Sequence, residues 1–79
     1  IYPNPTRHFL QFQYFMKQPD NLTISIYDIQ GNVVQKIDFG MQSAGLHYDG
    51  LPIENLATGT YLLSFDTNAG SITRKFVKN

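Results

Sequence analysis

Two histidines and several aspartates are the residues of this chain best suited to metal or acid–base chemistry. His47 and Asp49 are two positions apart. On a strand that spacing places both side chains on one face, where they could supply half of a metal site. The sequence offers no third ligand at a useful spacing, so we expect no bound metal. His8 has no evident partner, and we expect it at the surface.

Serine side chains are the available nucleophiles. A serine triad also needs a base and an orienting acid, held together around a pocket. A chain of 79 residues with only two histidines has little room for that arrangement. The lack of cysteine excludes disulfides, zinc–thiolate sites and thiol nucleophiles. We therefore predict that the chain is not an enzyme and carries no cofactor.

The composition is that of a small globular domain. Hydrophobic residues make up 42% of the chain and the net charge is zero. This indicates a packed core and gives no long-range field that would attract nucleic acid or an anionic membrane. No apolar run approaches the ~20 residues of a membrane span, so we expect no direct membrane insertion. We predict a single domain over residues 1–79, and the opening at Ile1 suggests a piece of a longer protein.

Short stretches of alternating apolar and polar residues predict strands throughout. In the clearest of them Leu10, Phe12, Ile24, Ile26 and Leu63 point inward. In the stretch 33–39, we expect Val33, Gln35, Ile37 and Phe39 to share one face. In the stretch 71–78, we expect Ile72, Arg74 and Phe76 to do the same. The predicted strands are residues 8–15, 22–28, 33–39, 46–51, 60–67 and 71–78, and the segment around Pro3 to Pro5 is expected to be extended.

Turn residues separate these strands. Gly31 is expected to supply the positive φ that closes a hairpin. We expect a loop from Gly40 to Gly45 and a single helical or 3₁₀ turn from Pro52 to Leu56. The pattern predicts an all-β fold, an immunoglobulin-like antiparallel β-sandwich of about seven short strands. A five-stranded barrel is the alternative.

Four short motifs, in a fixed order, span the chain. They are Pro3-Asn4-Pro5; Tyr27-Asp28 with Gly31 and Val33-Val34; Leu56, Gly59 and Tyr61; and Lys75-Phe76-Val77-Lys78. In this order and spacing they resemble the C-terminal sorting domain of the type IX secretion system, the type A sorting domain of the Por secretion system. Asn79 departs from the commoner basic ending, and residues 51–55 are less typical.

This resemblance implies a function in protein export. The domain would direct a larger cargo protein, located upstream in the same chain, across the outer membrane. The cargo would pass through the periplasm and end at the cell surface or outside the cell. The implied partners are an outer-membrane shuttle protein and a sortase-like peptidase that usually removes the domain. The signal residues would be those of the four motifs.

The residues themselves leave more ordinary interpretations open. Gly31 and Gly59 fit simple turn residues, and Tyr61 fits a core residue with its hydroxyl at the rim. Strand 71–78 is expected at or near a sheet edge, where Lys75 and Lys78 would discourage indiscriminate pairing. These cations could equally face solvent or dock on an acidic partner. The alternative function is an immunoglobulin- or fibronectin-like accessory module that binds carbohydrate or spaces out a surface enzyme, with Tyr14, Tyr27 and Tyr48 as candidate stacking rings.

Overall fold

The computed structural model describes residues 8–79, and this part of the chain forms six β-strands. The segment around Pro3 to Pro5, expected to be extended, lies outside the described residues. The strands are β1 (Phe9–Met16), β2 (Asp20–Asp28), β3 (Val33–Gln42), β4 (Gly45–Pro52), β5 (Gly59–Thr67) and β6 (Gly70–Lys78).

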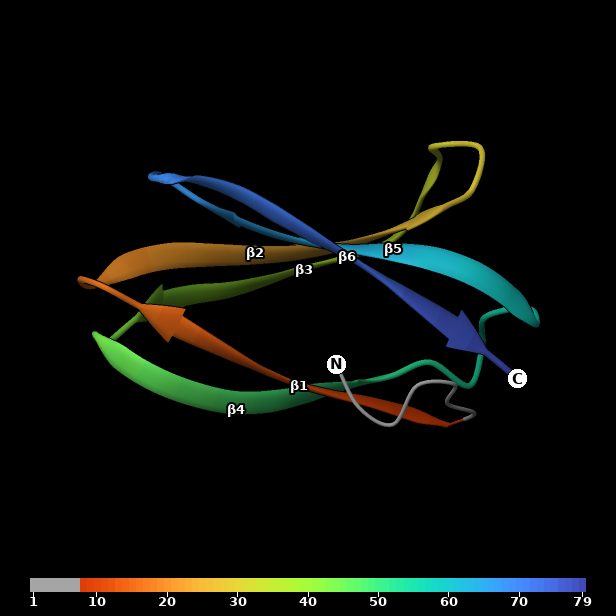
Figure 1. Cartoon of the computed structure of the whole chain (residues 1–79), viewed down its shortest axis with the longest axis horizontal. Helices are drawn as coiled ribbons and strands as arrows, with labels where there is room; N and C mark the ends of the chain where they lie inside the picture. The colour runs from red at the N-terminus through yellow and green to blue at the C-terminus, as the bar shows by residue number, and fades with distance from the viewer. Residues whose placement is uncertain (1–7) are drawn as a thin grey trace.

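The strands form two separate antiparallel sheets packed face to face (Figure 1). The larger sheet has the order β3-β2-β5-β6, and the smaller one consists of β1 and β4. The prediction of an antiparallel sandwich is therefore confirmed, and the five-stranded barrel is wrong. Among the described strands, β6 lies at an edge of the larger sheet, as expected.

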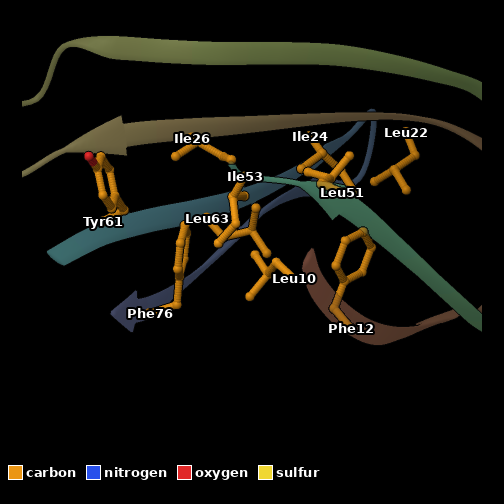
Figure 2. Close-up of a cluster of buried hydrophobic side chains, with 10 residues drawn as sticks. All are labelled: Leu10, Phe12, Leu22, Ile24, Ile26, Leu51, Ile53, Tyr61, Leu63 and Phe76. Atoms are coloured by element: carbon orange, nitrogen blue, oxygen red, sulfur yellow. The ribbon is translucent and has the colours of Figure 1, made fainter. Parts of the chain in front are cut away.

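The core lies between the two sheets and follows the predicted alternation. Leu10 and Phe12 of β1 face Ile24 of β2 and Leu63 of β5, and all four side chains are buried (Figure 2). The ring of Phe12 meets Phe65 edge-on, with 5.3 Å between centroids. Aromatic and aliphatic side chains of both sheets thus fill one continuous core.

Two bulges in β3 overturn parts of the prediction. The predicted loop from Gly40 to Gly45 is wrong, because β3 continues to Gln42 and β4 begins at Gly45. Gly40 has a φ of 72° at a shift in register with β2, so it bends the strand without ending it. The second shift, beside Tyr27, leaves Val34 as the extra residue, and Val33 is 54% exposed instead of sharing the inward face.

The connection after β4 contains one hydrogen-bonded turn, from Ile53 to Leu56, where a helical or 3₁₀ turn from Pro52 to Leu56 was predicted; Pro52 still belongs to β4 and no helical segment forms there. The Leu56 N–H donates to the Ile53 carbonyl at 3.1 Å. No helix occurs in residues 8–79, and so none there is long and apolar enough to cross a membrane.

Candidate recognition site at one end of the sandwich

Three of the four motifs lie together at one end of the sandwich. They occupy the end of β2, the start of β5 and the end of β6. Asp28 is paired with Tyr61, and Tyr61 with Phe76, so the three segments are direct neighbours across the larger sheet. We call this region, residues 27–33, 53–62 and 75–78, the motif end. Pro3, Asn4 and Pro5 lie outside the described residues.

Tyr61 forms the centre of the motif end. Its ring is buried and stacks on Phe76, with 5.6 Å between centroids and 22° between planes (Figure 2). Its hydroxyl donates to the Ala57 carbonyl at 2.6 Å. Leu56 packs against the same core, and Gly59, with a φ of 155°, begins β5. This motif therefore builds a corner that fixes the loop before β5 to the core.

The two lysines of β6 have different environments. The Lys78 ammonium donates to the Leu56 carbonyl at 2.7 Å and to the Glu54 carbonyl at 3.3 Å. It thereby ties the end of β6 to the turn after β4. Lys75 points to the opposite, outward face and is exposed. Of the two side chains, Lys75 is the more exposed, and Lys78 is half-buried.

The turn between β2 and β3 is organised by Asp28. Its carboxylate accepts hydrogen bonds from the N–H groups of Asn32 and Gln30, both at 2.9 Å. These bonds, that of Asn32 above all, lower the pKa of Asp28 below its ordinary value of 3.8. Gly31 has a φ of 92°, and its N–H donates to the Asp28 carbonyl at 3.0 Å. Only glycine adopts such a conformation without strain.

A row of side chains crosses the outward face of the larger sheet at the motif end. The strand register aligns Val33, Tyr27, Leu62 and Lys75 in that order, from one sheet edge to the other. Leu62 is 37% exposed, Val33 54%, and Tyr27 is half-buried. We call these four residues the outward row. Leu62 was not predicted as a site residue, although a leucine at an outward strand position was the available signal.

The residues considered for metal chemistry have other partners. The ring of His47 stacks on Tyr14, with centroids 5.0 Å apart, and its Nε2 donates to the Ser43 carbonyl at 2.7 Å. Asp49 accepts from the Gly50 N–H at 2.9 Å. Burial, and then the Asp49 carboxylate, raise the pKa of Tyr14. Residues 8–79 contain no cluster of three metal-ligating side chains.

The remaining candidate residues are also engaged or isolated. His8 is exposed and lies 3.9 Å from the Glu54 carboxylate. Ser25 and Ser64 are buried in the sheet, and Ser64 donates to Asp66 at 2.8 Å. Among the tyrosines considered for sugar stacking, Tyr48 is 66% exposed, whereas the Tyr14 hydroxyl is bonded to Gln42. These contacts favour structural roles for most of the polar side chains.

The described residues form a small β-sandwich, with three of the four motifs at one end. A family model described as "Secretion system C-terminal sorting domain" matches residues 1–79. The chain belongs to this family, and it is a C-terminal sorting signal of type IX secretion that directs export across the outer membrane to the surface or beyond. Searches of curated proteins and of solved structures gave no significant match.

Proposed function

We propose that the motif end is the surface by which the secretion machinery recognises the folded domain. The observation that carries this proposal is the convergence of three sequence-distant motifs on neighbouring strands. The partner would be an outer-membrane shuttle protein that receives the domain, with its cargo, in the periplasm. A sortase-like peptidase would then act upstream of the domain.

Within the motif end, the residues divide into two groups. Leu56, Gly59, Tyr61, Phe76 and Lys78 hold the end together from within. The outward row and the Asp28 turn offer side chains that a partner can reach. A partly apolar row that ends in an exposed cation suits a partner surface with an apolar centre and an acidic rim.

The domain itself would act without catalysis or cofactor. Its contribution would be a rigid arrangement of strands that presents the outward row in one register. This fits a binding surface, where specificity comes from the placement of a few anchoring side chains.

A reporter fusion tests this proposal. A periplasmic signal peptide, a fluorescent protein, a native upstream linker and residues 1–79 would be expressed with and without a working type IX system. We expect surface or extracellular reporter only where the system works. Leu62→Ser and Lys75→Gln should reduce export, while Lys36→Gln, an exposed lysine elsewhere on the same sheet, should not. Equal export of all three variants would refute recognition through the outward row.

A further inference from the structure

We propose that a second surface, a groove between β1 and the β5–β6 hairpin, binds an extended peptide that carries a carboxylate. The groove has a volume of about 770 Å³ and lies at the end of the sandwich opposite the motif end. The groove contains none of the four residues of the outward row. The proposal rests on the groove alone, so it stands or falls independently of the recognition site proposed above.

The groove exists because the smaller sheet covers only part of the larger one. Phe76 of β6 is fully buried, but Ile72, on the same inward face of β6, is 56% exposed. Leu22 and Phe65 form the apolar floor beside Ile72, and Met16 of β1 lines the other wall. An inward sheet face that stays open resembles a sandwich in which one strand is missing.

At Gln13 and Phe15, the wall formed by β1 is a strand edge that no other described strand covers. The Ile53 N–H donates to the His8 carbonyl, so these two residues form a hydrogen-bonded pair. In an antiparallel pair such pairs recur at every second residue, so the backbone N–H and C=O groups of residues 10, 12, 14 and 16 point toward β4. The backbone N–H and C=O groups of Gln13 and Phe15 therefore point away from β4, toward the groove. No described strand pairs with that side of β1. An extended peptide could add here as a third strand of the smaller sheet.

Charge identifies the peptide's chemistry. The Arg74 guanidinium lines the groove, and the one hydrogen bond that it donates within the described residues goes to the adjacent Thr73 carbonyl at 3.1 Å. Lys17 adds a second positive charge. The acidic residue of the groove, Asp20, is already bonded to Asn68 and to the Asn21 N–H, at 2.8 and 2.7 Å. An apolar floor beside a guanidinium that no described carboxylate engages suits alternating apolar side chains and one carboxylate.

Nuclear magnetic resonance titration of the 79-residue chain tests the proposal. The probe is the peptide acetyl-Thr-Val-Thr-Glu-Thr-Val-Thr-amide, whose valines and glutamate share one strand face. We expect saturable shifts at peptide concentrations of about 1 mM, confined to the amides of β1 and the β5–β6 hairpin. Replacing the peptide's glutamate by glutamine, or making Arg74→Gln, should each weaken binding about two- to fivefold. Lys75→Gln, on the opposite face of β6, should leave it unchanged.

A pair of proline variants tests the strand edge. Gln13→Pro removes an N–H that points into the groove, whereas Gln11→Pro removes one farther along the same edge, outside it. We expect binding to be lost only in the first. If both variants unfold, the Arg74 and glutamate substitutions still decide the question. Absence of saturable shifts, shifts centred on Tyr48, or a dimer of the chain that protects Gln13 and Phe15 without peptide would each overturn the proposal.

Discussion

Removing the hydroxyl of Tyr61 should destabilise the domain while leaving its core packing intact. In the Tyr61→Phe variant the ring keeps its stacking on Phe76 and its burial among core residues. The variant loses only the hydrogen bond to the Ala57 carbonyl at 2.6 Å. The change therefore isolates the link between the loop before β5 and the core.

The expected cost follows from that single bond. A hydrogen bond within a protein contributes about 1 kcal/mol net, because unfolding replaces it with bonds to water. Ala57 is exposed, so water can bind its freed carbonyl and no large desolvation penalty is added. We expect Tyr61→Phe to lower the free energy of unfolding by about 1 kcal/mol. For a domain of this size, that loss corresponds to a fall in Tm of roughly 4–8 °C.

Urea unfolding followed by circular dichroism measures this loss. The midpoint should fall while the m-value stays the same, since the surface exposed on unfolding does not change. Tyr48→Phe is the matched control. The Tyr48 side chain is 66% exposed, so removing its hydroxyl should leave the free energy of unfolding unchanged. If Tyr61→Phe were no less stable than Tyr48→Phe, the bond to Ala57 would not hold the corner, and the reasoning would be refuted.

Three further predictions concern the motif end. Lys78→Gln should lower stability by about 1 kcal/mol in the same assay, since it loses bonds to two carbonyls, whereas Lys75→Gln should be neutral. Because the folded pKa of Asp28 is depressed, its ionised form stabilises the fold above the ordinary value of 3.8 and this contribution is lost as the pH falls through the lowered pKa. Acid titration of Asp28→Asn should therefore show a weaker dependence of stability on pH in this range than the parent. Gly31→Ala should cost about 1–2 kcal/mol by thermal unfolding, because alanine is strained at a φ of 92°.

The sequence predicted the parts of the fold that depend on strict alternation. Leu10 and Phe12 in β1, and Tyr61 and Leu63 in β5, are buried as their period of two requires. The prediction was wrong in β3, where each bulge adds one residue to β3 opposite β2. A bulge depends on how two strands pair, and the alternation within one strand does not reveal that pairing. After such a shift every side chain changes face, as Val33 shows.

The candidate site was predictable as a set of residues but not as a surface. The last motif named Lys75 and Lys78 together, without distinguishing their roles. What distinguishes them is the partner of Lys78, two carbonyls more than twenty residues away in a turn. The outward row was missed for a similar reason. Its four members come from four strands, and only the register brings them into line.

This dependence on register leads to a last prediction about how the domain is recognised. The outward row exists only when β3, β2, β5 and β6 are paired, so a partner that binds it must bind the folded domain. A synthetic peptide of residues 71–79 contains Lys75 but none of the other three row residues. We therefore expect this peptide not to compete with the intact domain in a periplasmic export assay, even in large excess.

The corresponding variant in the whole domain is Tyr61→Ala, which leaves every row residue in place but removes a buried aromatic ring. Truncating a large buried aromatic residue to alanine lowers the free energy of unfolding by about 3–5 kcal/mol. This is a large fraction of the total free energy of unfolding of a domain of this size. Export should fall in proportion to the unfolded fraction measured by circular dichroism. Efficient competition by the peptide, or normal export of an unfolded Tyr61→Ala domain, would show that the signal is read as a linear segment and not as a surface.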